Sequence, residues 1–222
     1  MEDTPGRRER KKLATRQAIL DAARPLFLER GFDPVTIAEV ADAADVSVAT
    51  VFNHFRTKED LVFWNQPADE RALADAVRAA GPGERVLDAV RRYEEQRVTA
   101  KQEPDAMAGY RRFLTVLAGS ETLRARERWI EVRRREELQA ALAEVLGPGA
   151  GEVEVELLAG QLVAAHRAID TVVRRGILAG DGPARLRGAA TAAVEEVFAA
   201  LEAGAGRHRS AAQGTGGPGT SP

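Results

Sequence analysis

Residues 36–55 are the stretch that most constrains the fold of this chain. Two short segments within it carry apolar residues at helical spacing, and only a few residues separate them. Thr36 and Ser47 each precede one segment, where a side-chain oxygen can accept a hydrogen bond from the unpaired N–H groups of a helix start. The small Ala41 and Ala44 allow the two helices to cross closely. The pattern predicts a helix-turn-helix, the geometry that places a second helix in the major groove of DNA.

The second of these helices divides into an apolar and a polar face. Four apolar residues recur at helical spacing and are expected to pack inward: Val48, Val51, Phe52 and Phe55. The remaining positions are short or polar, as suits contact with base edges and phosphates: Ala49, Thr50, Asn53 and His54. Asn53 stands out because Asn is a poor helix former in mid-helix, whereas its amide has a bidentate fit to adenine.

The residues around the two helices carry a family resemblance. From Thr15 to Phe63 the sequence resembles the DNA-binding domain of TetR-type regulators. The positions that carry the resemblance are Ala18–Ala23, Leu26-Phe27, Arg30–Phe32, Thr36, Asp45–Ser47 and His54–Leu61. The resemblance implies an all-helical, homodimeric transcriptional repressor that a ligand releases from DNA, with one recognition helix per subunit.

The family motif, carried over residue by residue, implies a DNA contact surface. Its members in this sequence are Arg16, Thr36, Ser47, Val48, Ala49, Thr50, Phe52, Asn53, His54, Thr57 and Lys58. Phe52 stands where the family usually has Tyr, so a phosphate hydrogen bond through a hydroxyl is lost. Val48 and Ala49 replace longer or basic residues, which favours contact with thymine methyl groups. Asp45 replaces the usual turn glycine, and Asp tolerates the left-handed conformation.

Several of these residues also have a purely structural interpretation. Thr36 and Ser47 would cap helices in a protein that never binds DNA, and Phe52 is most simply a core residue. The net charge of -2 is unusual for a DNA-binding protein, but positive charge is concentrated between Arg7 and Arg16. That segment is either a DNA-binding arm or a solubilising tail, and the neighbouring helix-turn-helix favours the arm.

The whole chain is predicted to be all-α, with an N-terminal helix-turn-helix domain of three helices and a larger helical domain. The predicted parts are a basic disordered arm (1–14), the DNA-binding domain (15–64), an effector-binding and dimerisation domain (65–203) and a disordered tail (204–222). Within them we expect helices over 15–30, from Thr57 until Pro67 interrupts, over 121–146, over 153–178 and over 184–203. The last two either pair with their copies in a second subunit as a four-helix interface or pack within one subunit.

The signal for an effector site is weaker. Nine residues could line a mostly apolar cavity with a few polar groups: Tyr93, Met107, Tyr110, Phe113, Leu117, Trp129, Arg133, His166 and Asp170. The competing interpretation is an ordinary helical core. His166 and Asp170 are four residues apart and are predicted to pair on one helix face. The stretch from Arg111 to Trp129 is similar to the C-terminal domains of a TetR subgroup that senses acyl-CoA-like molecules, which implies an apolar effector with an anionic part, such as an acyl-CoA or another fatty-acid-like compound.

Other classes of function find little support in the sequence. The chain has no Cys and only three His, which lie far apart, and it lacks a glycine-rich phosphate loop and a serine elbow. We therefore expect no catalytic site, cofactor or metal. We also expect a cytoplasmic protein without membrane contact, since no run approaches the length of a membrane span. The alternative to a regulator is a helical adaptor or architectural protein without an effector.

Overall fold

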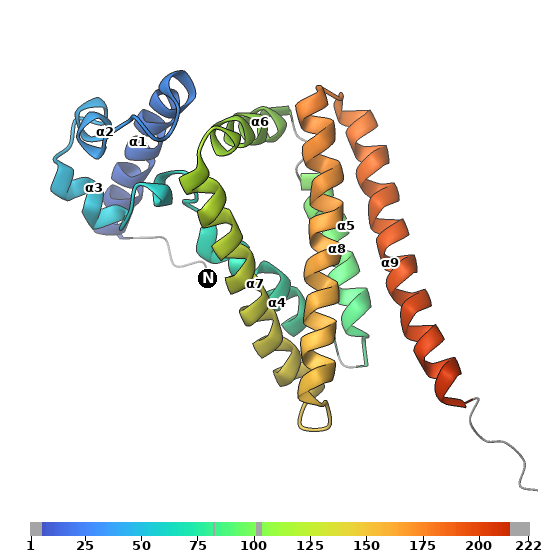
Figure 1. Ribbon diagram of the computed structural model, residues 1–222. Coiled ribbons are helices and arrows are strands. Elements are labelled where there is room, and N and C mark those ends of the chain that lie inside the picture. The colour runs from blue at the N-terminus through green and yellow to red at the C-terminus, as the bar shows by residue number, and fades with distance from the viewer. Residues whose placement is uncertain (1–5, 82, 101–103, 214–222) are drawn as a thin grey trace, which may run out of the picture. The chain divides into compact units, whose positions relative to one another are not determined.

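The computed structural model describes residues 6–81, 83–100 and 104–213. Every regular element in these ranges is a helix, which confirms the predicted all-α fold class (Figure 1). The chain divides into two compact units, residues 1–70 with 108–133 and residues 71–107 with 134–222. The predicted boundary near residue 64 stays a prediction, and residues 108–133, which lie in the predicted second domain, fall in the first compact unit.

Helix α1 (Arg7–Arg30) is one continuous helix that includes Pro25. It ends at Gly31, whose N–H donates to the carbonyl of Phe27 and whose φ of 80° favours glycine. The predicted disordered arm is wrong for residues 7–14, which form the first turns of α1. These positions hold Arg, Glu, Lys, Leu and Ala, all good helix formers, so the helix can extend beyond its packed part. Residues 1–5 of the predicted arm lie outside the described residues.

Helix α2 (Ile37–Ala43) begins with a capping box. The Thr36 hydroxyl accepts a hydrogen bond from the N–H of Glu39 at 3.2 Å, and the Glu39 carboxylate accepts one from the N–H of Thr36 at 2.7 Å. The hydrogen bond from the Thr36 backbone, together with Arg30 and the Thr36 hydroxyl, lowers the pKa of Glu39 to about 2. The carboxylate therefore remains charged at the positive end of the helix, where negative charge is stabilising.

Helix α3 (Val48–His54) begins at Ser47, whose hydroxyl accepts a hydrogen bond from the N–H of Thr50 at 3.1 Å. Asp45, in the turn before it, has a φ of 52°, which confirms that Asp replaces the turn glycine in a left-handed conformation. Helix α1 packs against α2, and α2 packs against α3 (Figure 1). The core of these helices is apolar and consists of Ile19, Leu20, Ala23, Phe27, Val40, Ala41, Val51 and Phe55.

The segment after α3 differs from its prediction. A 3₁₀ helix, η1 (Glu59–Leu61), takes the place of the expected longer helix, and α4 (Gln66–Arg78) follows. Pro67 does not interrupt a helix. It is the second residue of α4, in the first turn, where the missing N–H has no intrahelical partner to lose.

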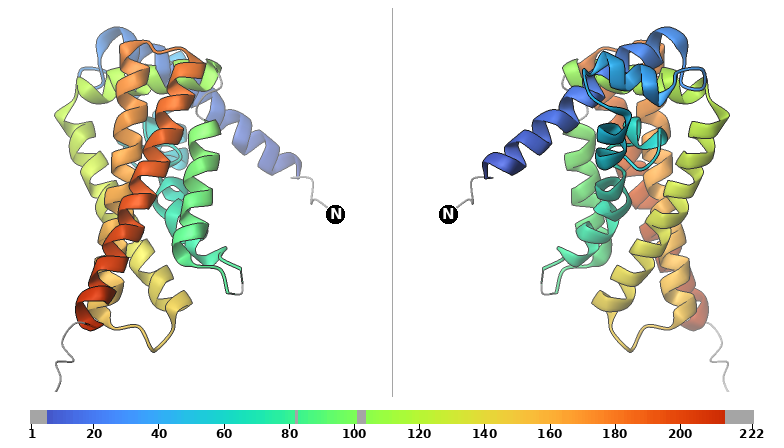
Figure 2. Two further views of the ribbon diagram at one scale, coloured as in Figure 1. Left: turned by 90° about the vertical axis from the view of Figure 1, so that its right-hand side faces the viewer. Right: turned by 90° about the vertical axis from the view of Figure 1, so that its left-hand side faces the viewer.

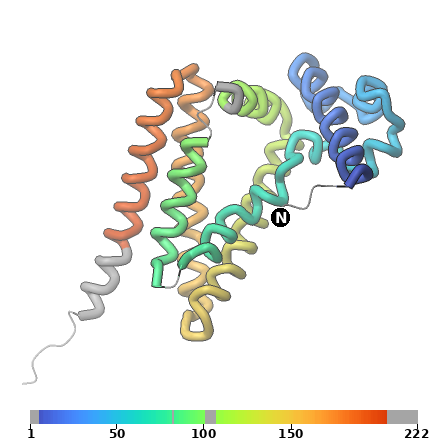
Figure 3. The backbone as a smooth tube through the Cα atoms, turned by 180° about the vertical axis from the view of Figure 1, so that it is seen from behind, coloured from blue at the N-terminus to red at the C-terminus, as the bar shows by residue number. Residues whose placement is uncertain are grey.

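The remaining helices are α5 (Val86–Ala100), α6 (Pro104–Ala118), α7 (Glu121–Leu146), α8 (Glu152–Ala179) and α9 (Pro183–Gln213). In the second unit, α8 and α9 lie side by side, and α5 contacts α9 (Figures 1, 2 and 3). Helix α9 includes residues 204–213, which corrects the predicted start of the tail, and residues 214–222 lie outside the described residues. No helix in the described ranges is long and apolar enough to cross a membrane.

The crossing of α8 and α9 depends on a close approach at Gly176. A Cβ placed on Gly176 would lie 2.8 Å from Cδ1 of Leu186 and 3.2 Å from Oδ2 of Asp181. Leu186 is only 1% exposed, so it has little room to move aside. Glycine is therefore required here by the packing of the two helices rather than by its backbone conformation.

We expect Gly176→Ala to lower the free energy of unfolding by about 1–2 kcal/mol, because overpacking outweighs the gain in helix propensity. Gly188→Ala in α9 is the matched control, since a Cβ on Gly188 has nothing within 4 Å. The control should be neutral or stabilising. Urea unfolding of the two variants beside the wild type measures this, and equal midpoints for all three would contradict the packing argument.

Candidate nucleic-acid interface and a buried polar network

The exposed face of α3 is broader and more apolar than the sequence predicted. Val51 and Phe55 are buried as expected, but Val48 is 41% exposed and Phe52 is 50% exposed. The expectation that these two pack inward is wrong, because α3 has only two turns and the buried stripe is narrow. Val51 and Phe55 alone fill it, and Phe52 falls on its edge, toward solvent.

Four residues of α3 form one exposed surface, which we call the reading face: Val48, Ala49, Phe52 and Asn53. Their spacing places them on adjacent turns of one helix side. The side chains offer apolar contact and one amide, and they carry no charge. Apolar side chains match the methyl group of thymine in the major groove, and an Asn amide matches the N6 and N7 edge of adenine.

The residues that cap the two helices lie at the ends of this motif. Ser47 and Thr50 are also joined through their hydroxyls, at 2.8 Å, and Thr36 is engaged with Glu39. The backbone N–H of Thr57 donates to the Asp60 carboxylate at 3.2 Å, and Thr57 itself is exposed. Thr36, Ser47, Thr50 and Thr57 therefore have local structural roles, and their predicted DNA contacts stay predictions.

Two cations of the predicted contact surface have intramolecular partners. The Arg16 guanidinium donates to the carbonyl of His54 at 3.1 Å and to that of Trp64 at 2.9 Å. The Lys58 ammonium donates to the carbonyl of Asp33 at 3.1 Å and lies 4.2 Å from the centre of a Phe32 ring. Burial lowers the pKa of Lys58, and nearby carboxylates oppose that shift.

His54 is the last residue of α3. Burial, followed by the positive charges of Arg16 and Lys12, lowers its pKa below the ordinary 6.5. At neutral pH the imidazole is therefore uncharged and can only offer hydrogen bonds to DNA. Exposed cations also gather on the first turns of α1, the end of this helix that is drawn in dark blue in Figure 2: Arg7, Arg8, Arg10, Lys11 and Lys12.

The nine residues predicted to line an effector site divide between the two units. Tyr110, Phe113, Leu117, Trp129 and Arg133 belong to the first unit, and Tyr93, Met107, His166 and Asp170 belong to the second. Tyr110 stacks on Phe113, and Phe63 meets Phe113 edge-on with ring centres 5.7 Å apart. Leu117 is buried, whereas Trp129 is exposed and lies over the Arg126 guanidinium. A single effector site composed of all nine stays a prediction.

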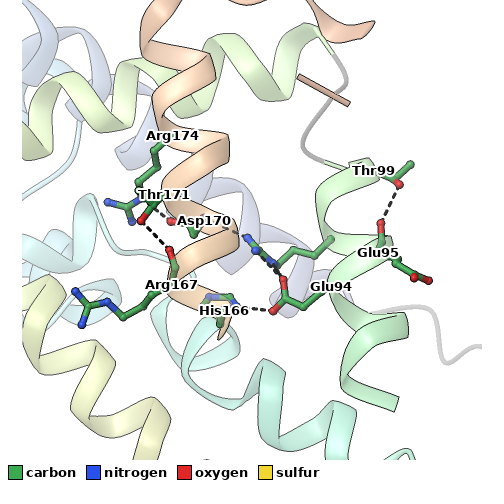
Figure 4. Close-up of polar contacts among 9 residues, drawn as sticks. Glu94, Glu95, Thr99, His166, Arg167, Asp170, Thr171 and Arg174 are labelled. Carbon is green, nitrogen blue, oxygen red and sulfur yellow. Dashed lines mark hydrogen bonds and ion pairs between the residues drawn. The ribbon is translucent and has the colours of Figure 1, made fainter. Parts of the chain in front are cut away.

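A buried polar network joins α5 to α8 in the second unit (Figure 4). Nδ1 of His166 lies 2.7 Å from Oε1 of Glu94. Arg97 donates from Nε to the other Glu94 oxygen at 2.8 Å and from Nη1 to Asp170 at 3.2 Å, and Asp170 also accepts from Arg174. The sequence predicted that His166 pairs with Asp170; the structure instead gives His166 a glutamate and Asp170 two arginines.

The charges in this network determine the protonation of its members. Glu94 is only 1% exposed. Burial raises the pKa of Glu94, but the hydrogen bonds from His166 and Arg97 and the positive charge of Arg97 outweigh it and hold that pKa below its usual value. Burial lowers the pKa of His166 more than Glu94 raises it. We therefore assign an ionised Glu94 and a neutral imidazole that donates its Nδ1–H, because a carboxylate can only accept.

Glu94, Arg97 and Arg174 were not among the sequence-predicted site residues. One signal was available for Glu94, which falls midway between Val90 and Val98 on the apolar stripe of α5. A carboxylate at a core position of an amphipathic helix predicts a buried partner. The identity of that partner could not be read from the sequence, since His166 lies on α8, far along the chain.

We expect Glu94→Gln to lower the free energy of unfolding by about 3 kcal/mol, because it leaves Arg97 buried with one of its two carboxylates lost. Glu95→Gln, one residue along the same helix, is the control: Glu95 is exposed and pairs with Arg91, so little change is expected. Thermal and urea unfolding of both variants measure the difference. Equal effects of the two substitutions would show that the network does not stabilise the unit.

Comparisons with known proteins agree with the geometry of the helix-turn-helix. Residues 19–63 match the family described as bacterial regulatory proteins of the tetR family. The regulator TcmR of Streptomyces glaucescens is 34% identical over 86 residues, which cover 39% of this chain and 38% of TcmR. The chain thus spans well under half the length of this curated relative.

Solved structures extend the likeness over both units. NalD, described as the secondary repressor of the MexAB-OprM multidrug efflux pump in Pseudomonas aeruginosa, has a TM-score of 0.56 at 21% identity, over 85% of this chain and 96% of NalD. SmeT in complex with triclosan has a TM-score of 0.55 at 18% identity, over 84% of this chain and 91% of SmeT. At these identities the likeness concerns the fold. Residues 19–63 thus match the DNA-binding part of the tetR family of bacterial regulatory proteins, and the helical fold over both units is similar to that of these solved structures.

Proposed function

We propose that this protein binds double-stranded DNA as a homodimer and represses transcription until a small effector releases it. Each recognition helix α3 lies in the major groove of one half of a pseudo-palindromic operator. The observation that carries this proposal is the reading face: four exposed residues without charge, on a helix held by a capped turn. An exposed Phe52 costs free energy in water, and contact with an apolar base edge removes that cost.

The proposed division of roles follows from charge. The reading face holds no ionisable group, so affinity for the phosphates must come from elsewhere. The exposed cations on the first turns of α1 supply positive charge in the same unit, in the segment that the sequence predicted to be an arm. Helical backbone there does not oppose the proposal, since phosphate contact requires charge rather than a particular backbone conformation.

The proposed dimer uses the outer faces of α8 and α9. One face of α8 packs against α9 within the unit, whereas the opposite face leaves Val153, Leu157 and Leu178 exposed, at 81%, 57% and 58%. Ala164 and Ala168 lie exposed between them on the same stripe. The sequence left open whether these helices pack within one subunit or between two. Because α8 has an apolar face on each side, both arrangements are compatible, and a symmetric interface would cover its outer stripe.

The experiment that tests the proposal is fluorescence anisotropy of the purified protein on DNA from upstream of its own gene. Random DNA serves as competitor at about 0.15 M salt, where nonspecific phosphate contacts are weakened. Tight binding that resists the competitor supports the regulator, and a symmetric footprint supports the dimer. Failure on upstream DNA and on a genomic library would reject the proposal and favour the adaptor alternative.

We expect Asn53→Ala to reduce discrimination between operator variants by about 1–3 kcal/mol at one base pair, with little change in nonspecific affinity, because the amide contacts a base edge. Gln96→Ala is the control, since Gln96 is also an exposed amide on a helix, but on α5. Competition binding on single-base operator variants measures both. A uniform loss over all variants would assign Asn53 to phosphate contact instead.

The effector is proposed to bind in the helical domain and to belong to the acyl-CoA or fatty-acid-like class. The sequence resemblance between Arg111 and Trp129 is what supports this class. Saturation at one hundred times Kd should stabilise the protein by about 2.7 kcal/mol and raise Tm by several degrees. Thermal-shift measurements with acyl-CoAs, free fatty acids and free coenzyme A check it, and the absence of any shift at saturating ligand would remove this class.

A further inference from the structure

Two arginines donate hydrogen bonds to the stretch that runs from η1 to the start of α4. Arg126 of α7 donates from Nε to the Gln66 side chain at 2.8 Å and from Nη2 to Oδ1 of Asp60 at 3.3 Å. Arg16 of α1 donates from Nη2 to the carbonyl of Trp64, two residues before Gln66, at 2.9 Å. All five residues belong to the first unit, and both arginines are half-buried.

Arg16 extends this connection to the recognition helix. Its Nη1 donates to the carbonyl of His54, the last residue of α3, at 3.1 Å, and its guanidinium lies 4.4 Å from the centre of the Phe55 ring. A guanidinium is planar and holds its donors in a fixed relation. The Arg16 side chain therefore sets the separation between the end of α3 and the Trp64 carbonyl. A lysine has one side-chain nitrogen and cannot hold both carbonyls in this fixed relation.

Asp60 connects the end of α3 to α7 through a second set of hydrogen bonds. Its Oδ2 accepts hydrogen bonds from the backbone N–H groups of Arg56 at 3.0 Å and of Thr57 at 3.2 Å, directly after α3. Its Oδ1 accepts from Arg126. The carboxylate thus lies between the end of the recognition helix and α7, and two separate paths lead from α7 to residues 54–57.

We propose that Arg16 and Arg126 act together as one clamp that positions the recognition helix, so that a shift of α7 changes the affinity for DNA. In this role Arg16 is a positioning residue and not a phosphate contact, since both of its terminal nitrogens already donate to backbone carbonyls of its own unit. The consequence for DNA binding rests on the proposed function. The clamp itself is a property of the first unit and can be tested without DNA.

The test is a double-mutant cycle with Arg16→Lys, Arg126→Lys and the double variant, measured as operator affinity at several salt concentrations. Each single variant should lose affinity about tenfold, the loss expected for one charge-assisted hydrogen bond. The slope of log affinity against log salt should not change, because no phosphate contact is lost. The double variant should also lose about tenfold rather than a hundredfold, since either substitution releases the same clamp.

Arg128→Lys is the matched control, because Arg128 lies on the same helix, is exposed and pairs with Glu121. It should bind DNA like the wild type, and all variants should keep their helical circular dichroism. A hundredfold loss in the double variant would show that the two arginines act independently. A shallower salt slope for Arg16→Lys with unchanged affinity for Arg126→Lys would make Arg16 a phosphate contact and overturn the proposal.

Hydrogen exchange separates failure of the clamp from failure of the proposed function. Arg126→Lys should speed amide exchange at residues 55–57 several-fold in the free protein, whereas Arg128→Lys should not. Faster exchange in a protein that binds no DNA would preserve the clamp and reject the regulator. Unchanged exchange in Arg126→Lys would overturn the clamp even where the wild-type protein binds its operator.

Discussion

A helix of seven residues is too short to be stable in water by itself, and the recognition helix α3 has seven. Its conformation therefore depends on what holds its two ends. At the N-terminal end of α3, the Ser47 hydroxyl accepts a hydrogen bond from the Thr50 N–H. At the C-terminal end, Arg16 donates a hydrogen bond to the carbonyl of His54. Burial of Phe55 against the same arginine completes the arrangement. Arg16 thereby links α1 to the C-terminal end of α3.

The features that could be predicted from the sequence are those whose causes lie within a few residues. The caps at Thr36 and Ser47 and the left-handed Asp45 depend on neighbours in the chain, so local rules apply. The roles of Arg16 and Glu94 depend on carbonyls and side chains that are distant in sequence, and periodicity contains no information about them. The apolar residues of α3 could be recognised from their spacing. How many of them are buried depends on how closely α1 and α2 approach, which is a tertiary property.

The second unit is ordered by two different kinds of constraint. Gly176 sets the approach of α8 and α9 by sterics, and the ion pairs around Glu94 and Asp170 set the position of α5 on α8. Buried ion pairs have strict geometric requirements, because each charge that loses its partner is costly. A small molecule that enters this part of the unit must therefore match an arrangement of charges that is already paired, or replace one of its members.

On the proposed function, the apolar composition of the reading face has a consequence for the recognition of methylated DNA. The methyl group at C5 of thymine is the feature that Val48, Ala49 and Phe52 are suited to contact. Methylation of cytosine at C5 adds the same group at the same place in the major groove. On the proposed function, an operator with a cytosine under this face would change its affinity when that base is methylated. The protein would then respond to the methylation state of its DNA through the same side chains that select its sequence.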